Sequence, residues 1–458
     1  MVRLPWKRVH ILGIGGAGLS AIARVLREQG VWVSGCDRVN GPVMHALASA
    51  GVEVQVGHDA RHVRGVDVVL ATSAAKEDHP EIRAARENNV PVLRRRELLP
   101  HLLAEREVIA VAGTHGKTTT TGMIVHLLRS SGKEIGYIVG AWLPRWGNAA
   151  AGRERRFVIE ADEYDYMFWG IDPAIAVVTN VEWDHVDCFP APEDYQEAFA
   201  GFVRRAKRAV IVCAESQPAL AVAEKALVPV ITFGLNTSAD WTAQVMGTSA
   251  RGGVRFRPVF QGTPLPVEVT LPVPGYHNVL NALAALAALV AGGEEPSEIA
   301  GHLNTYPGAS RRFQVKGEIN GILVIDDYAH HPTEVRATLA AARMAYPQRR
   351  VWAVFQPHTY SRTRAFLDAW RHAFAEADRV VVMDIYAARE QDDLGLSGPA
   401  VAAAIQHPHV LYGGAEETTV RLLAAHLAAG DVVITLGAGT SVRVAEALVE
   451  RLRERRRG

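Results

Sequence analysis

The chain has 458 residues, which predicts about three domains of ordinary size. Lys and Arg together number 49, as do Asp and Glu, so the formal net charge is zero, which excludes an overall field that attracts nucleic acid or an anionic membrane. The three cysteines form no CxxC pair and no apolar stretch could span a bilayer, so we expect no disulfide framework, no membrane insertion and a reducing, cytoplasmic location.

Residues 1–103 are expected to form a first α/β domain. Strand 9–14 leads through a glycine-rich turn into helix 19–30, and further strands follow at 31–37, 52–57 and 66–74. Strands that alternate with helices in this way predict a parallel sheet of the Rossmann type.

The first glycine-rich turn carries Gly13, Gly15 and Gly18 in a G-x-G-x-x-G pattern, and Asp37 ends the next strand. Glycines let the backbone approach a diphosphate, and the helix N-terminus offers free N–H donors. The pattern therefore predicts diphosphate binding, either of a nicotinamide dinucleotide or of a nucleotide such as UDP. A tight turn without a ligand is the alternative.

Residues 104–312 are expected to form a central α/β domain. Strand 108–113 opens it, four further strands alternate with helices, and helix 277–293 closes it. Residues 240–272 consist of short alternating runs broken by Gly and Pro, which predicts a small antiparallel insertion.

The turn after strand 108–113 reads GTHGKTT and precedes a helix. In that context backbone N–H groups cradle phosphates, Lys117 contacts the β- and γ-phosphates of ATP, and the Thr118 hydroxyl binds Mg²⁺. Only two residues separate the glycines, fewer than in the common P-loop, but the residue types predict the same chemistry. The candidate ATP-binding residues of this turn are Gly113, Thr114, His115, Gly116, Lys117, Thr118 and Thr119. Two phosphate-binding turns in one chain suggest two phosphorylated ligands.

Acidic and histidine side chains follow later strands of the central domain. Glu160 lies near the end of strand 156–162, and His185 follows strand 174–181. Open α/β sheets bind ligands at this edge, so Thr118, Glu160 and His185 are candidate Mg²⁺ ligands. The sequence leaves open an ion pair or helix cap for Glu160 and a turn hydrogen bond for His185.

Residues 313–458 are expected to form a third α/β domain, also Rossmann-like, with strands at 321–328, 350–358, 379–386 and 431–439. The strands are again apolar and alternate with helices, which predicts a parallel sheet.

Charged residues cluster at the start of this third domain. Arg312, in SRRF at the domain junction, can reach the γ-phosphate of ATP as domains close. Tyr328 and His330 follow one strand, and His358 and Arg362 follow the next. Histidine and arginine at adjacent strand ends predict a site for a carboxylate, with a solvated loop rim as the alternative.

Ten motifs resemble those of the Mur ligase family in order and spacing, over essentially the whole chain. They are VHILGIGGAGLSAIA, SGCD, AVAGTHGKTTT, VIEADEYD, VVTNVEWDH, GYHNVLNALAA, GASRRF, DDYAHHPTE, FQPHTYSRTR and LGAGT. Within the family, the resemblance is to the branch that adds L-alanine.

The resemblance implies a UDP-sugar domain, an ATPase domain and a domain that brings the amino acid. It implies ATP- and Mg²⁺-dependent ligation of L-alanine to the lactyl carboxylate of UDP-N-acetylmuramate through an acyl phosphate, in peptidoglycan precursor synthesis. The implied UDP-sugar site contains Gly13, Gly15, Gly16, Ala17, Gly18, Ser20, Asp37 and Ser73. The implied ATP site adds Asn278, Asn281, Arg312 and Asp327, and the amino-acid site contains Tyr328, His330, His358 and Arg362.

The implied catalytic residues are Lys117, His185, Arg312, His330 and His358. The general base is left open between His330 and His358. Thr359 stands where some relatives carry arginine, so carboxylate binding is expected to rest on Arg362. The stretch after His185 lacks the lysine that some sister ligases carry, in agreement with the alanine-adding branch.

Three other functions compete with this interpretation. A sister ligase that adds a preformed peptide shares the N-terminal and ATP motifs, but FQPHTYSRTR favours a single amino acid. A nicotinamide oxidoreductase leaves GTHGKTT and SRRF without a role, and a non-catalytic ATP-gated sensor does not need the full set of catalytic positions. We expect no nucleic-acid partner, and a monomer or weak homodimer.

Overall fold

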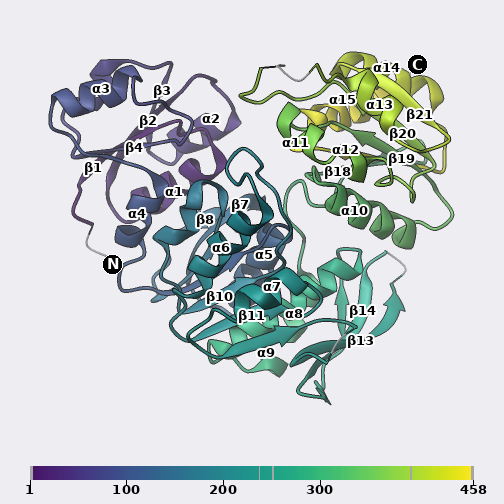
Figure 1. Ribbon diagram of the computed structural model, residues 1–458, viewed down its shortest axis with the longest axis horizontal. Coiled ribbons are helices and arrows are strands. Elements are labelled where there is room, and N and C mark those ends of the chain that lie inside the picture. The colour runs from purple at the N-terminus through teal and green to yellow at the C-terminus, as the bar shows by residue number, and fades with distance from the viewer. Residues whose placement is uncertain (1–3, 237, 250–251, 392–394, 455–458) are drawn as a thin grey trace.

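The computed structural model describes residues 4–236, 238–249, 252–391 and 395–454. Within these residues the strands form three sheets, one in each successive part of the chain, and helices pack against them (Figure 1). The α/β class expected from the sequence is confirmed. Across the described ranges, no helix is both long and apolar enough to cross a membrane.

The N-terminal sheet is parallel, with strand order β3-β2-β1-β4-β5. Apolar side chains of β1 face a cluster with α1 on one side, while alternate residues face α3 on the other, as the pleat of a strand requires. The two-residue β5 was not expected. The elements are β1 (Arg8–Leu12), α1 (Ala17–Glu28), β2 (Trp32–Asp37), α2 (Pro42–Ser49), β3 (Glu53–Val56), η1 (Ala60–Val63), β4 (Val68–Ala71), α3 (Pro80–Glu87), β5 (Val92–Leu93) and α4 (Arg95–Leu102).

The central sheet is mixed, and its first half has β6 in the middle, flanked by β10 and β9. The hairpin of β7 and β8 extends it beyond β9 and was not expected, because Gly and Pro interrupt its hydrophobic pattern. These elements are β6 (Glu107–Ala112), α5 (Lys117–Ser130), β7 (Gly136–Leu143), β8 (Gly147–Ala150), β9 (Arg156–Glu160), η2 (Tyr164–Gly170), β10 (Ile175–Val178), α6 (Pro192–Val203), β11 (Ala209–Cys213) and α7 (Gln217–Ala223).

The antiparallel insertion expected at 240–272 is confirmed. It does not form a sheet of its own, because β13 pairs with β12 and extends the central sheet. The alanine-rich α8 is buried on nearly all sides, and its small side chains let α5 pack closely against it. These elements are β12 (Val230–Phe233), β13 (Trp241–Thr248), β14 (Val254–Phe260), β15 (Thr263–Pro264), β16 (Val269–Leu271), α8 (Tyr276–Ala291), α9 (Pro296–Ala300) and η3 (Gly301–Thr305).

The C-terminal sheet has strand order β17-β18-β22-β19-β20-β21, parallel except for the edge strand β17. The four expected strands are present as β18, β19, β20 and β22, whereas the half-exposed edge strands β17 and β21 were not expected. The elements are β17 (Gln314–Ile319), β18 (Ile322–Asp327), α10 (Pro332–Ala345), β19 (Arg350–Phe355), α11 (Tyr360–Ala365), α12 (Leu367–Trp370), β20 (Arg379–Met383), α13 (Gly398–Ala404), β21 (Val410–Gly414), α14 (Glu416–His426), β22 (Asp431–Leu436) and α15 (Ser441–Glu454).

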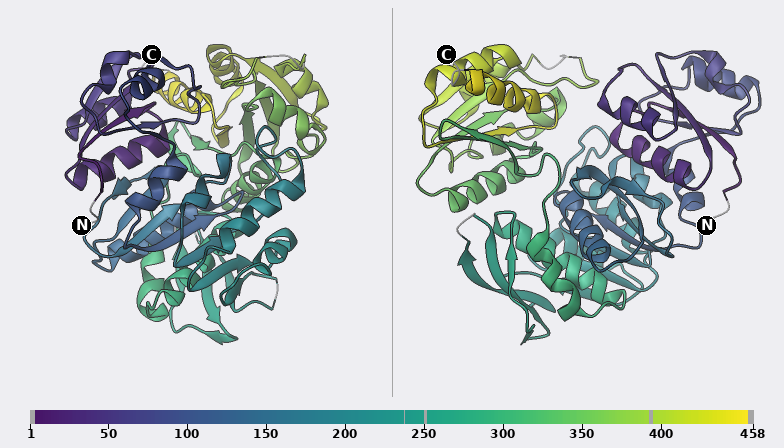
Figure 2. Two further views of the ribbon diagram at one scale, coloured as in Figure 1. Left: turned by 60° about the vertical axis from the view of Figure 1, so that its left-hand side comes forward. Right: turned by 180° about the vertical axis from the view of Figure 1, so that it is seen from behind.

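The N-terminal and C-terminal domains stand side by side on the same side of the central domain (Figures 1 and 2). A cavity of about 860 Å³ lies where the three meet, and its walls include Ser73, Lys117 and Tyr328, one from each domain. The fold therefore brings the three sequence-predicted sites to one shared space.

Candidate active site

The phosphate loop joins the end of β6 to the start of α5. Gly113 and Gly116 both have positive φ, 134° and 79°, and a side chain at Gly113 would collide with Thr179 on the neighbouring strand connection. Only glycine adopts these angles without strain, so the turn can bring backbone N–H groups to the helix N-terminus. Such a turn is a ready anion site.

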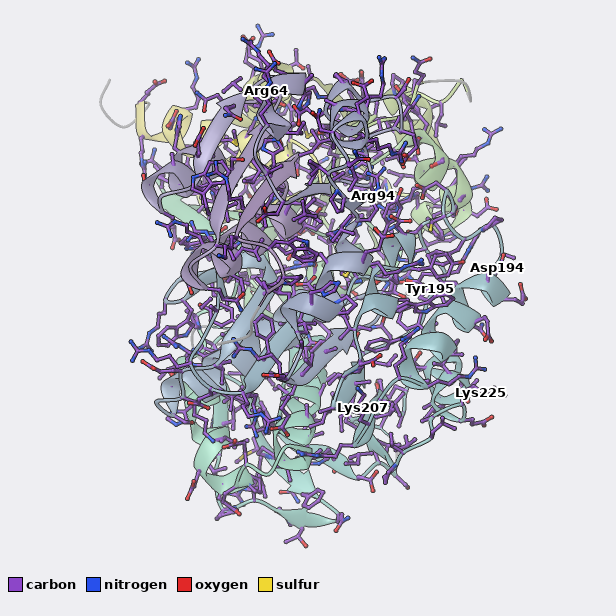
Figure 3. The ribbon with its side chains drawn as sticks, turned by 90° about the vertical axis from the view of Figure 1, so that its left-hand side faces the viewer. Arg64, Arg94, Asp194, Tyr195, Lys207 and Lys225 are labelled. Carbon is purple, nitrogen blue, oxygen red and sulfur yellow. The ribbon has the colours of Figure 1, made fainter. Side chains whose placement is uncertain are left out.

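Lys117, the first residue of α5, points back across the loop. Its Nζ donates hydrogen bonds to the carbonyl oxygen of Gly113 at 2.6 Å and to Glu163 Oε2 at 2.8 Å. The Glu163 carboxylate is fully buried and also accepts a hydrogen bond from the hydroxyl of Tyr195, at 3.0 Å. Figure 3 labels Tyr195 on α6, beside the exposed Asp194.

The charges around Glu163 are tightly coupled. Burial alone raises the pKa of Glu163, but Lys117 and His185 outweigh it and lower the pKa to about 2. For Lys117 the directions are reversed: burial lowers its pKa, but the surrounding carboxylates have the larger effect and raise the pKa above its ordinary value. The ammonium is therefore charged and held within the loop, where an incoming phosphate can replace part of its contact with Glu163.

Thr118 and Glu160 lie side by side next to the loop. The Thr118 hydroxyl donates to Glu160 Oε1 at 2.8 Å, the backbone N–H of Gly140 donates to Glu160 Oε2 at 2.6 Å, and Arg312 donates to Thr118 Oγ1 at 3.3 Å. The hydroxyl oxygen of Thr118 and the carboxylate of Glu160 are ligands that fit Mg²⁺, which prefers oxygen. The imidazole of His185 faces Glu163 instead, at 3.4 Å.

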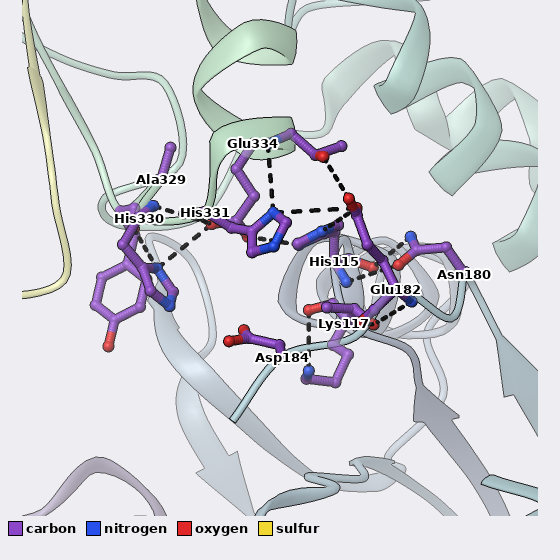
Figure 4. A network of polar contacts seen from close by, with 12 residues as sticks. His115, Lys117, Asn180, Glu182, Asp184, Ala329, His330, His331 and Glu334 are labelled. Carbon is purple, nitrogen blue, oxygen red and sulfur yellow. Dashed lines mark hydrogen bonds and ion pairs between the residues drawn. The ribbon is translucent and has the colours of Figure 1, made fainter. Parts of the chain in front are cut away.

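His115 connects the loop to the C-terminal domain (Figure 4). Its Nε2 lies 2.9 Å from Glu182, and its Nδ1 lies 3.3 Å from Glu334 on α10. Thr333, also on α10, donates to Glu182 at 2.7 Å. Burial lowers the pKa of His115, but the two carboxylates outweigh it and raise the pKa to about 9. A charged His115 therefore bridges the central and C-terminal domains.

We expect stability to fall as pH rises through the folded-state pKa of His115. That pKa is about 9, above the ordinary value of 6.5, so the stabilisation is complete below pH 6.5 and is lost above pH 9. The difference corresponds to about 3 kcal/mol. Urea unfolding of the native chain and of His115→Gln across this range measures it. Equal pH dependence in both proteins contradicts the assignment.

The expected amino-acid site is assembled by α11 and by the loops that follow β10, β18 and β19. Arg362 donates from Nε to Asp184 at 2.8 Å and approaches His358 Nδ1 at 3.4 Å. The rings of His330 and His358 lie 5.7 Å apart, and Tyr328 and His330 are in edge contact. All four predicted residues of this site line the 860 Å³ cavity.

Burial controls the charges of this region. It lowers the pKa of His330 to about 3 and that of His358 to about 4, and the positive charge of Arg362 contributes to both shifts. Asp184 behaves in the opposite way, because Arg362 and the nearby histidines overcome burial and hold its pKa below the usual range. The site thus presents neutral imidazoles beside an ionised, paired arginine.

A second cavity, of about 290 Å³, lies on the other side of the phosphate loop. Its walls include His115, Arg312 and three further residues of the predicted ATP site: Asn278, Asn281 and Asp327. Asn281 donates to Asn278 at 3.2 Å. Burial raises the pKa of Asp327 to about 6 although it accepts two backbone hydrogen bonds. The structure thus gathers these predicted ATP-site residues around one cavity beside the phosphate loop.

The first glycine turn lies at the N-terminal wall of the large cavity. The lining residues from the predicted UDP-sugar set are Gly13, Gly16, Ala17, Gly18 and Ser73. Gly15, Ser20 and Asp37 do not line the cavity: Gly15 N donates to Asp37 Oδ2 at 3.0 Å, and the buried Ser20 hydroxyl donates to the Ala17 carbonyl oxygen. These three therefore hold the shape of the turn in this structure.

Three family models match the chain in sequence order. They are described as Mur ligase family, catalytic domain (residues 8–107), Mur ligase middle domain (111–289), and Mur ligase, glutamate ligase domain (311–439). The chain belongs to the Mur ligase family.

Individual members of the Mur ligase family resemble the chain over nearly its full length. The UDP-N-acetylmuramate–L-alanine ligase of Roseiflexus sp. (strain RS-1) is 44% identical, covering 97% of this chain and 99% of its own. The UDP-N-acetylmuramate-alanine ligase MurC of Thermotoga maritima superposes with a TM-score of 0.82 at 28% identity, over 98% of this chain and 99% of its own. A murein peptide ligase of Psychrobacter arcticus superposes with a TM-score of 0.72 at 27% identity, over 97% of this chain and 98% of its own.

Several polar residues of this Mur ligase site were not assigned from the sequence. Glu163, Glu182, Asp184 and Glu334 each hold a predicted residue in place, and Arg95 of the N-terminal domain reaches Asp162 at 3.3 Å. The signal for Glu334 was available, because His331-Pro-Thr-Glu has the spacing of a helix capping box, which the structure contains. The other pairings join distant segments and leave no local pattern.

Proposed function

We propose that this Mur ligase uses ATP to join L-alanine to the lactyl carboxylate of UDP-N-acetylmuramate, in the cytoplasm, as a step of peptidoglycan precursor synthesis. The observation that carries the proposal is the single cavity that borders the first glycine turn, the phosphate loop and the His330–Arg362 region together. A ligase needs all three, since one substrate must be activated by ATP and then meet the other. The alanine ligases that align over nearly the whole chain support the same reaction.

The first step transfers the γ-phosphoryl group of ATP to the lactyl carboxylate and releases ADP. Lys117 begins α5 and contacts the loop carbonyl of Gly113, and Arg312 contacts the hydroxyl of the next residue, Thr118. Both cations can stabilise the charge that develops on the phosphoryl oxygens. Thr118 and Glu160 would hold Mg²⁺, with His185 as a further candidate ligand. The bound ion would neutralise phosphate charge.

The second step is attack of the L-alanine amine on the acyl phosphate, with release of inorganic phosphate. Arg362 would hold the alanine carboxylate, and the amine must lose a proton as the amide forms. His330 Nδ1 donates to the Tyr328 carbonyl oxygen at 2.9 Å, which leaves Nε2 with its lone pair. Because this geometry leaves Nε2 unprotonated on the cavity wall, we propose His330 as the group that accepts the proton.

Replacing His330 with glutamine should lower kcat by about 100-fold or more, because proton transfer by a positioned base contributes 10²–10⁴-fold. The KM for ATP should stay unchanged. His358→Gln is the matched variant, because the ring of His358 lies 5.7 Å from that of His330 and contacts Arg362. It should act mainly on the KM for L-alanine. Steady-state kinetics with each substrate varied in turn separate the effect on kcat from the effect on KM. A larger loss of kcat in His358→Gln than in His330→Gln assigns the proton transfer to His358 instead.

The test of the proposed function is release of phosphate from ATP and Mg²⁺ in the presence of UDP-N-acetylmuramate, with and without each candidate amino acid. The expected result is release that requires both UDP-N-acetylmuramate and L-alanine, and a product heavier by one alanyl residue in its mass spectrum. Turnover only with a preformed peptide moves the chain to the peptide-adding branch. Absence of turnover with every combination rejects the ligase proposal.

A further inference from the structure

A cluster of metal-binding side-chain types lies inside the N-terminal domain, away from the cavity. His10 comes from β1, Cys36 from β2, His62 from η1 and Glu81 from α3. Their ligand atoms all lie within 4.8 Å of one another. His10, Cys36 and Glu81 are completely buried, and the His62 side chain is 15% exposed. No step of the proposed reaction uses any of the four.

The Glu81 carboxylate stands at the centre of this cluster. Its Oε2 lies 3.1 Å from His10 Nε2, and its Oε1 lies 3.1 Å from His62 Nδ1. The Cys36 sulfur lies 3.1 Å from both oxygens, and the backbone N–H of Asp59 donates to Oε1 at 3.0 Å. Four donor groups, counting His58 at 3.5 Å, thus converge on Oε1, which has two lone pairs. A metal cation bound to this carboxylate would take the place of the side-chain protons that His10, Cys36 and His62 direct toward it.

We propose that His10, Cys36, His62 and Glu81 form a binding site for a divalent transition-metal ion with the ligand preference of Zn²⁺. A thiolate, two imidazole nitrogens and a carboxylate oxygen are ligands that Zn²⁺ takes in tetrahedral sites. Tetrahedral bonds of usual length put ligand atoms about 3.3–3.6 Å apart, so the four groups need only small shifts. This inference does not rest on the proposed function.

The surroundings suit a closed structural site. Ser34 Oγ lies 2.8 Å from His10 Nδ1, which fixes the ring and directs Nε2 into the cluster. His62 and His58 are partly exposed, so an ion has a path from solvent. Four protein ligands leave no open position for a substrate, as is typical of zinc that stabilises a fold.

The site lies directly beneath the first glycine turn. The carbonyl oxygen of Cys36 accepts hydrogen bonds from the backbone N–H groups of Gly13 at 2.9 Å and Ile14 at 3.1 Å. An ion on the Cys36 sulfur would therefore tie the end of β2 to β1, η1 and α3 just below this turn. We expect the metal to raise the thermal stability of the N-terminal domain.

The experiment uses the full chain without an affinity tag, stripped of metal and titrated with Co²⁺ and then Zn²⁺. The expected result is one equivalent of Co²⁺ with a sulfur-to-cobalt charge-transfer band, which Zn²⁺ abolishes. A second group of donors, His115, Glu182 and His331, contains no thiol and cannot give that band. Of the two donor groups found among the described residues, only the N-terminal one can therefore give the band.

Cys36→Ser should remove the band and lower Zn²⁺ affinity by more than about 100-fold, since loss of an outer-shell partner alone costs 10–100-fold. Cys188→Ser, at a partly buried free cysteine outside the cluster, is the matched control and should keep the band and the Zn²⁺ affinity. His62→Ala, at the exposed edge of the cluster, should weaken binding at least about tenfold even if Cys36→Ser fails to fold. His45→Ala, an exposed histidine of α2, should not. Binding without the band, or unchanged in His62→Ala, overturns the proposal.

Discussion

Replacing Lys117 with alanine should abolish ADP release, with kcat lowered by about 1000-fold or more. The ammonium is the cation nearest the loop carbonyls of Gly113 and Thr114, and one preorganised charge at a transferring phosphoryl group contributes on this scale. Single-turnover ADP formation, with UDP-N-acetylmuramate present and L-alanine omitted, isolates the step. Normal ADP formation by this variant removes the phosphate-loop assignment.

The same substitution also disturbs a buried ion pair, and a second variant separates the two effects. Without Lys117, the fully buried Glu163 loses its closest cation, which costs about 3–5 kcal/mol of stability for a buried pair. The double variant Lys117→Ala with Glu163→Gln removes the unpaired charge, so its melting temperature should recover while its ADP release stays absent. Recovery of activity along with stability assigns to Lys117 a structural role only.

The two glycine turns were predictable because their information is local. Each joins a strand to a helix, and positive φ at Gly13, Gly113 and Gly116 requires glycine at those positions. The sequence also placed the insertion after β12 and the strands that end at Glu160 and Asp327. A short pattern of residue types is sufficient for such features, because backbone geometry determines them.

The electrostatic partners were not predictable in the same way. Glu163 meets Lys117 across 46 positions of sequence, and Asp184 meets Arg362 across 178. The first pair depends on how segments of the central domain pack together, and the second on how the central and C-terminal domains dock. No local spacing records either arrangement. The N-terminal His10–Cys36–His62–Glu81 cluster is similar, because its four residues come from four separate elements and share no short metal-binding motif. The sequence therefore predicts residues that line the two cavities, and not the charged partners that hold those side chains in place.

Arg362 is expected to control the amino acid, and Arg362→Ala should raise the KM for L-alanine by about 10- to 100-fold. A hydrogen bond to a charged group contributes 1.5–3 kcal/mol, and the guanidinium lies with Tyr328, His330 and His358 on the cavity wall. The KM for ATP should not change. Kinetics with L-alanine varied at saturating ATP and UDP-N-acetylmuramate give the result.

Two further variants test whether the raised KM of Arg362→Ala comes from the lost contact with the carboxylate of L-alanine. Arg362→Ala leaves Asp184 buried with its main cation gone, so the double variant with Asp184→Asn should recover stability but keep the raised KM. Arg362→Lys retains the charge but loses the planar fork, so its KM for L-alanine should fall between the wild-type and alanine values. If the double variant recovers the wild-type KM, then Arg362 acts by balancing Asp184 at the domain interface, and the carboxylate of L-alanine binds elsewhere.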